Sequence, residues 1–285
     1  MARALGPDRR ISLAPLTVVE LTPPETVGCA AAAGFDAVGL RLIPATPQEP
    51  KRPTIGMTPM IREARRRLDD TGLELIDIEV LRLTPDTDVR ADYLEFLETG
   101  AYLGARQILV AGNDPDRARM ADRFAELAAL AALFGLTPNI EPMPYNDIGT
   151  VAQAVAVLRA AGHPNAGILI DALHFDRGGN TVAELNPLPR SWFNYVQLCD
   201  APAEQPADRD ALVYQSRSAR QLPGQGGLDL DAMLHALPAD LPVSVEAPIV
   251  APGVPALERA RAALRHTRAV VDRADGRGYG TARAC

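Results

Sequence analysis

The sequence predicts an α/β fold, a (β/α)8 TIM barrel that forms a single domain over residues 1–285. Three observations support this prediction: short apolar runs alternate with helical patterns, eight such units follow one another, and no glycine-rich phosphate-binding turn follows the first strand. Alternating strands and helices require parallel pairing with right-handed crossovers, and eight units in a chain of this length indicate a barrel. A doubly wound open sheet is the competing architecture, but it usually carries the glycine-rich turn.

Short apolar runs bounded by turn residues predict the strands, because strands buried on both faces are continuously apolar. The first run is Ile11-Ser-Leu-Ala-Pro15, and the clearest later run is Gly167–Asp171, which ends abruptly in a carboxylate. The predicted strands cover residues 11–15, 35–43, 73–80, 107–111, 136–141, 167–171, 195–199 and 243–246.

Helical patterns between these runs predict the outer layer of the barrel. Gly34, Gly72 and Gly162 each close a helical stretch, where the left-handed conformation of glycine commonly ends a helix. After Asp171 a polar segment contains one amphipathic piece. The predicted helices cover residues 24–34, 60–71, 93–103, 117–134, 150–161, 228–237 and 255–272.

Two stretches are longer than plain connectors. The Pro-rich loop 44–59 and the irregular insertion 201–221 both lie on the expected mouth of the barrel, where loops of this length are usually functional. The barrel core therefore spans about residues 11–272. The Gly/Arg-rich tail, residues 273–285, is expected to be flexible.

The composition restricts the class of partner. A hydrophobic fraction of 47% without an apolar run of membrane-spanning length predicts a soluble protein with no membrane partner. The net charge of −7 argues against nucleic acid. Cys29, Cys199 and Cys285 are odd in number and widely spaced, so neither a disulfide framework nor a thiolate zinc site is expected. Since the N-terminus lacks a secretory signal, we expect a cytoplasmic protein that acts on a small molecule, and a homo-oligomer is compatible with the sequence.

Oxygen-bearing side chains stand at the ends of the later predicted strands. A single carboxylate in such a place is as readily a helix N-cap, but several on successive strands all project toward the C-terminal mouth, where barrel enzymes keep their active sites. Carboxylates crowded in a low-dielectric mouth repel one another unless a cation neutralises them. We therefore predict one divalent metal ion. The set is Glu141, Asp171, Gln197 and Glu246, with Arg41 and Glu79 at the ends of the second and third strands.

The type of ligand narrows the choice of metal. Three carboxylates and one amide oxygen form a hard, all-oxygen shell, which suits Mn²⁺ or Mg²⁺ and disfavours a zinc site built from His or Cys. The prediction is Mn²⁺, with Mg²⁺ or Co²⁺ able to substitute.

Five motifs together resemble the xylose isomerase-like TIM-barrel superfamily, in its sugar phosphate isomerase/epimerase branch. The similarity extends from Ile11 to about Asp272, and the motifs follow the order found in that family. They are Asn139-Ile-Glu141-Pro142, Asp171-Ala-Leu-His174, Val196-Gln-Leu-Cys-Asp200, Arg220-Gln-Leu-Pro-Gly-Gln-Gly226 and Ser244-Val-Glu246.

The resemblance implies a role for each matching residue. Glu141, Asp171, Gln197 and Glu246 would bind the metal, Glu141 and Glu246 would also act as the acid/base pair, and His174 and Arg220 would hold substrate oxygens. Asp171 would then be a ligand and not the base. The alternative for His174 is a buried core residue whose hydrogen bonds are satisfied within the protein. The alternative for Arg220 is a loop arginine with no role in binding. Arg41 and Glu79 are candidate substrate-selecting residues that packing could equally explain.

The chemistry implied by the resemblance is removal of a proton next to a carbonyl, followed by one of several outcomes. If a proton is then returned to carbon, the reaction is an isomerisation or epimerisation. The leading interpretation is therefore an isomerase or epimerase of a keto-sugar, polyol or hydroxy-ketone. The ketose 3-epimerases of this superfamily usually have His where this chain has Gln197, and a Gln here is similar to 3-dehydroshikimate dehydratases. A metal-dependent lyase is therefore the alternative.

Three other classes are less compatible with the sequence. The superfamily includes a DNA-repair endonuclease with a histidine-rich zinc site, but this chain has 4 His and a net charge of −7. The only lysine, Lys51, lies in the Pro-rich loop, which argues against a Schiff-base aldolase. A non-catalytic binding protein is the remaining option.

Overall fold

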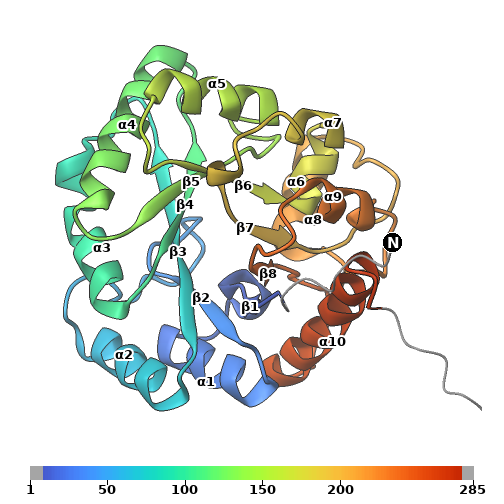
Figure 1. Ribbon diagram of the computed structural model, residues 1–285. Coiled ribbons are helices and arrows are strands. Elements are labelled where there is room, and N and C mark those ends of the chain that lie inside the picture. The colour runs from blue at the N-terminus through green and yellow to red at the C-terminus, as the bar shows by residue number, and fades with distance from the viewer. Residues whose placement is uncertain (1–8, 278–285) are drawn as a thin grey trace, which may run out of the picture.

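A closed barrel of eight parallel strands forms the centre of the computed structural model, which describes residues 9–277 (Figure 1). Each strand pairs with the next along the chain, and β1 pairs with β8 to close the ring. The predicted TIM barrel is thus confirmed. The strands are β1 Ile11–Leu13, β2 Ala37–Arg41, β3 Glu74–Leu83, β4 Gln107–Gly112, β5 Thr137–Glu141, β6 Gly167–Asp171, β7 Phe193–Leu198 and β8 Val243–Val245.

Helices surround this ring on the outside (Figure 1). Short 3-10 helices, Pro15–Val18 and Arg190–Trp192, add to the connections. The α-helices are α1 Pro23–Ala33, α2 Pro59–Thr71, α3 Val89–Leu103, α4 Arg117–Ala132, α5 Val151–Ala161, α6 Ala172–Arg177, α7 Val182–Leu185, α8 Arg209–Ser218, α9 Leu230–Ala236 and α10 Ala256–Ala274.

The ends of α1 illustrate why the helices begin and end where they do. Thr22 and Glu25 form a reciprocal capping box, in which the Glu25 carboxylate accepts from the backbone N–H of Thr22 at 2.8 Å. Gly34 takes a left-handed conformation with φ of 90° and donates back to the carbonyls of Ala30 and Ala31. This is the C-terminal stop that the glycine pattern predicts.

The main core lies between the strands and the outer helices, where leucine, isoleucine and valine side chains are almost fully buried. A smaller apolar cluster fills part of the barrel interior and includes Ile76, Leu109, Leu169 and Tyr195. Polar side chains share this interior, among them Asp77, which is fully buried. The barrel is therefore closed below its mouth by packed side chains, as expected for this fold.

Three expectations about segments and their boundaries need correction. The insertion 201–221 is not wholly irregular, because it contains α8, whose N-cap Asp208 accepts from the backbone of Ala211 at 2.8 Å. The tail predicted from residue 273 begins inside α10, and residues 278–285 of that tail lie outside the described residues. The third strand also extends further than predicted, to Leu83.

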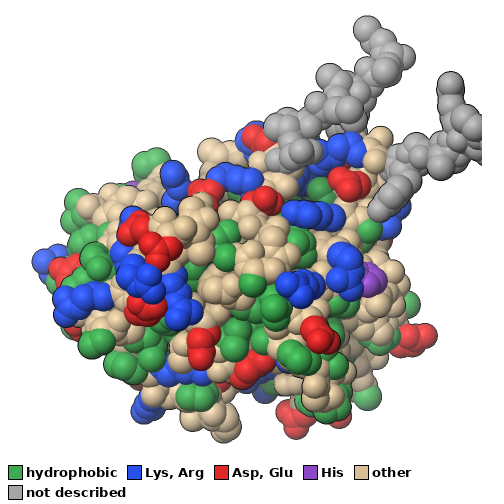
Figure 2. Space-filling view, turned by 90° about the horizontal axis from the view of Figure 1, so that it is seen from below, with side chains coloured by type: hydrophobic (Ala, Val, Ile, Leu, Met, Phe, Trp, Pro, Cys, Tyr) green, Lys and Arg blue, Asp and Glu red, His purple; other side chains and the backbone are tan. Residues whose placement is uncertain are grey.

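The outer surface mixes charges of both signs. Figure 2 shows one face, on which basic and acidic side chains are interspersed. On α2, Arg65 and Arg66 pair with Asp69 and Asp70, both at 2.5 Å, so the arginine-rich helix is an ion-paired outer face. No helix between residues 9 and 277 has both the length and the apolar character needed to cross a membrane.

Candidate active site

The barrel brings the four strand-end residues into one buried group at the mouth. Glu141 and Asp171 are the last residues of β5 and β6, Gln197 pairs in register with Asp171, and Glu246 directly follows β8. All four side chains are almost completely shielded from solvent. Parallel register is the cause, because it aligns the carboxyl ends of neighbouring strands.

Arg220 lies between two of these carboxylates. Its Nη1 is 2.6 Å from Asp171 Oδ2 and its Nη2 is 2.9 Å from Glu246 Oε2. The guanidinium also donates through Nε to the backbone carbonyl of Ser216 at 2.7 Å. Arg220 thus lies at the site and faces the mouth. Its contacts are to two candidate metal ligands, whose negative charge it neutralises.

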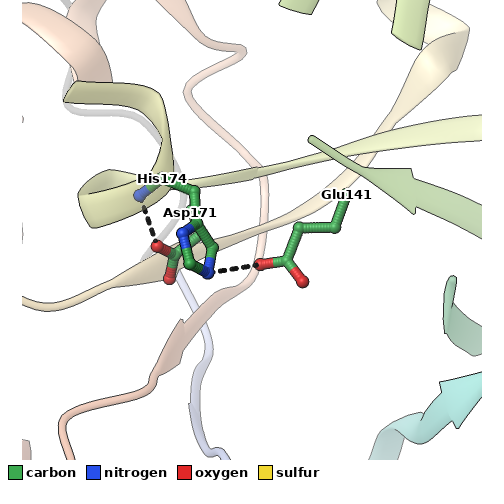
Figure 3. A group of neighbouring side chains, drawn as sticks. All are labelled: Glu141, Asp171 and His174. Atoms are coloured by element: carbon green, nitrogen blue, oxygen red, sulfur yellow. Dashed lines mark hydrogen bonds and ion pairs between the residues drawn. The ribbon is translucent and has the colours of Figure 1, made fainter. Parts of the chain in front are cut away.

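Glu141, Asp171 and His174 form a second close group, drawn in Figure 3. One ligand atom from each of the three lies within 4.8 Å of the others. The carboxylate of Glu141 faces the ring of His174, with Oε1 4.0 Å from Nε2, and the backbone N–H of His174 donates to Asp171 Oδ1 at 2.9 Å (Figure 3). His174, predicted to hold substrate, is therefore also placed where it could bind a metal.

Burial and neighbouring charge control the protonation of this group. Burial, assisted by Asp171 and Glu246, raises the pKa of Glu141 well above its usual value, and burial raises the pKa of Glu246 to about 7. Burial alone would raise the pKa of Asp171, but Arg220 and His174 hold it below its usual value. Burial lowers the pKa of His174 to about 4, so the imidazole is neutral at pH 7.

The site has the donor atoms that a divalent cation requires. Glu141 Oε1, Gln197 Oε1 and His174 Nδ1 are buried and have no hydrogen-bond partner among the described residues. Unpaired buried oxygens are costly, and a cation would satisfy them. Gln197 also donates through Nε2 to Glu246 Oε1 at 3.4 Å, which leaves its amide oxygen free to serve as a ligand. The residues therefore fit a divalent metal ion.

Arg41 and Glu79 form an ion pair at the opposite side of the mouth. Arg41 donates to Glu79 Oε1 through Nε at 2.8 Å, and its Nη1 donates to Glu49 Oε1 at 3.0 Å. Glu49 belongs to the Pro-rich loop and also accepts from the backbone of Ala45 at 3.1 Å. This ion pair ties the loop to the barrel, a role that the sequence did not indicate for Glu49.

A small cavity opens above these residues, with a volume of about 50 Å³. Its lining includes Arg41 and Glu246, Arg82 near the end of β3, Tyr145 on a loop, and Ser216 and Arg217 on α8. The hydroxyl of Tyr145 is 3.0 Å from Ser216 Oγ, and its ring lies edge-on to His174 with centroids 5.5 Å apart. Sequence patterns missed these residues because loops carry no period that fixes their direction.

Asp200 and Gly226 support the loop that carries Arg220. Asp200 accepts from the backbone N–H groups of Gly224 at 2.9 Å and Leu228 at 3.1 Å, and no hydrogen bond or ion pair joins its side chain to Arg220. A Cβ on Gly226 would lie 2.2 Å from the carbonyl oxygen of Ala201. The glycine therefore permits close packing of two backbone segments.

Curated relatives share part of this chain. A 3-dehydroshikimate dehydratase of Pseudomonas aeruginosa is 28% identical over 228 residues, which cover 75% of this chain and 33% of that protein. An inosose isomerase of Bacillus velezensis is 24% identical over 160 residues, which cover 53% of this chain and 55% of that protein. The chain thus spans about a third of the length of the dehydratase and about half of that of the isomerase.

Solved structures share the whole fold. A structure described as an IOLI protein with a binding zinc atom has a TM-score of 0.75 at 19% identity, covering 93% of this chain and 98% of that one. An L-ribulose 3-epimerase has a TM-score of 0.66 at 19% identity, covering 95% and 97%. A family model described as xylose isomerase-like TIM barrel matches residues 27–270. The chain therefore belongs to the xylose isomerase-like TIM barrel family, as its five motifs predicted.

Proposed function

We propose that this protein is a divalent-metal-dependent isomerase or epimerase of a small keto-sugar, polyol or hydroxy-ketone. The observation that carries the proposal is the buried group of Glu141, Asp171, Gln197 and Glu246 on four successive strands, with unpaired oxygens on Glu141 and Gln197. Inosose isomerases and sugar epimerases among the related proteins support the same class of reaction.

The same four residues would hold the ion, with Mn²⁺ as the first candidate and Mg²⁺ or Co²⁺ next. The buried ring of His174 is an additional candidate ligand, and a nitrogen ligand would bring Zn²⁺ into consideration. When bound, the ion would polarise a carbonyl and an adjacent hydroxyl of the substrate and so acidify the intervening C–H.

Glu141 and Glu246 are the proposed acid/base pair. In the metal-free site burial raises the pKa of both carboxyls, that of Glu246 to about 7. A bound cation would lower both pKa values and so favour the carboxylate that accepts a proton from substrate carbon. Arg220 fixes the orientation of the Glu246 carboxylate through the 2.9 Å contact, and the neutral ring of His174 can share a hydrogen bond with a substrate oxygen.

A dehydratase is the second candidate, and Gln197 is the residue that favours it. The same first step, proton removal beside a carbonyl, leads to loss of a β-hydroxyl when that group lies opposite an acid. The 28% identity with a 3-dehydroshikimate dehydratase over 75% of this chain supports this outcome. A new ultraviolet absorbance on incubation with 3-dehydroshikimate would distinguish the lyase from the isomerase.

Glu141→Gln and Glu246→Gln test the shared first step. Each variant of the Mn²⁺-loaded protein should lose about 10²- to 10⁴-fold in kcat on a substrate found by screening keto-sugars, inososes and 3-dehydroshikimate, because a positioned acid or base contributes that much. Glu98→Gln, an exposed carboxylate on α3, is the control and should retain full activity. Unchanged turnover in either active-site variant would contradict the assignment.

A further inference from the structure

Four arginines line the cavity at the barrel mouth, and two of them have no acidic partner. Arg41 is paired with Glu79 and Glu49, and Arg220 with Asp171 and Glu246. Within residues 9–277, neither Arg82 nor Arg217 forms a salt bridge. We propose that Arg82 and Arg217 bind a carboxylate group of the substrate. This inference rests on the proposed function, because it places the carboxylate beside the carbonyl that reacts.

Arg82 is held in place by neutral acceptors. Its Nη1 donates to Asn113 Oδ1 at 3.1 Å and its Nη2 donates to the backbone carbonyl of Ala45 at 3.0 Å. These bonds orient the guanidinium over the cavity but leave its charge uncompensated. Arg41, Arg82 and Arg217 line the same cavity, and burial together with the nearby charges of Arg217 and Arg41 lowers the pKa of Arg82.

Arg217 makes a cation–π contact with an aromatic ring. Its guanidinium carbon lies 5.7 Å from the centroid of the Tyr145 ring, and it makes no hydrogen bond among the described residues. Tyr145 itself is fixed by Ser216 and by the edge-on ring of His174. A cation–π contact uses none of the guanidinium N–H groups as hydrogen-bond donors, so they are available to a ligand.

Two unneutralised arginines that share a half-buried cavity repel each other, so an anionic ligand would be strongly favoured there. The planar fork of a guanidinium matches the two oxygens of a carboxylate. Glu246 and Arg220 line the same cavity, so one small molecule can reach both the arginine pair and the proposed acid/base group. The substrate is therefore a hydroxy-ketone that carries a carboxylate, as opposed to a neutral keto-sugar.

A matched pair of ligands tests the inference by direct binding. Catechol and 3,4-dihydroxybenzoate present the same two adjacent oxygens, but only the second has a carboxylate. By calorimetry on the Mn²⁺-loaded protein, after removal of free metal, the benzoate should bind at least about 10-fold more tightly than catechol, because charge-assisted bonds to two arginines are added. Arg82→Met and Arg217→Met should each remove most of that preference without weakening catechol.

Two further variants control for charge and folding. Arg62→Met removes the same charge from the exposed face of α2 and should keep the full preference. Arg217→Lys keeps the positive charge and should therefore keep part of the preference for the benzoate over catechol. A preference that survives both methionine variants, equal affinities for the two ligands in the unmodified protein, or failure of both ligands to bind would overturn the inference. Tighter binding of 3,4-dihydroxyphenyl phosphate than of the benzoate would also overturn it in favour of a phosphate.

Failure of this inference can be separated from failure of the proposed function. If the preference for the benzoate holds and no hydroxy-ketone is turned over, the carboxylate site stands and the proposed reaction fails. If a neutral ketose is turned over and the methionine variants behave like the unmodified protein, the proposed reaction stands and the carboxylate site fails.

Discussion

Glu246 and His174 have shifted pKa values whose effects on stability oppose each other. Glu246 has a folded-state pKa of about 7, above its ordinary value of 4.5, so its contribution to stability is lost as pH rises between these values. His174 has a folded-state pKa of about 4, below its ordinary value of 6.5, so its contribution is lost as pH falls between them. Each shift corresponds to a change on the order of 3 kcal/mol in the free energy of unfolding.

Glu246→Gln should therefore change the pH dependence of stability in one direction and His174→Asn in the other. In metal-free protein, the free energy of unfolding of Glu246→Gln, measured by urea denaturation relative to the unmodified protein, should rise with pH between about 4.5 and 7, because the raised pKa of Glu246 is removed while that of Glu141 is present in both proteins. On the same relative measure, the stability of His174→Asn should instead fall between about pH 4 and 6.5. Identical profiles for all three proteins would contradict the burial-based account of these residues.

The residues that the sequence predicts are those that barrel geometry forces together. Glu141, Asp171, Gln197 and Glu246 end strands whose register is set by parallel pairing, so recognising the strands is enough to place the side chains near one another. The contacts of Arg220 depend on the path of a loop, and no periodic pattern determines that path. The sequence therefore does not predict that Arg220 lies between Asp171 and Glu246, which only the folded structure shows.

Among the elements, α8 shows why the loops were harder to predict. Only Ser216 is fully buried on this helix, so the sequence lacks the apolar stripe by which a helix is usually recognised. Its N-cap, Asp208, is the signal that was present. The helix nonetheless carries Ser216 and Arg217 to the cavity, so two cavity-lining side chains come from the segment with the weakest sequence pattern.

The loop after α8 should be sensitive to a single methyl group. In Gly226→Ala the new Cβ would lie 2.2 Å from the carbonyl oxygen of Ala201 and 2.3 Å from Asp200 Oδ1, so the backbone must shift. We expect a loss of about 1–3 kcal/mol in the free energy of unfolding and a lower kcat, because the shift also moves Arg220. Urea denaturation and steady-state kinetics measure the two effects.

Gly28→Ala provides the matched control for that substitution. This glycine lies inside α1, and its Cβ would meet only the flexible end of Arg67 at 3.3 Å, so the variant should be as stable as the unmodified protein or more so. If Gly226→Ala were equally harmless, the loop would not be held by the close approach of Gly226 to Asp200 and Ala201.

For the whole molecule, the buried carboxylates make folding and metal binding interdependent. Mn²⁺ at 100 times its Kd should add about 2.7 kcal/mol to the free energy of unfolding, because the site exists only in the folded barrel. For a chain of this size that gain corresponds to a rise of roughly 5–10 °C in Tm. Asp171→Asn should abolish the rise, since it removes a proposed ligand that lies beside Glu141 and His174. Glu98→Gln should keep the full rise in Tm. If Mn²⁺ raised the Tm of Asp171→Asn and Glu98→Gln equally, the ion would bind elsewhere.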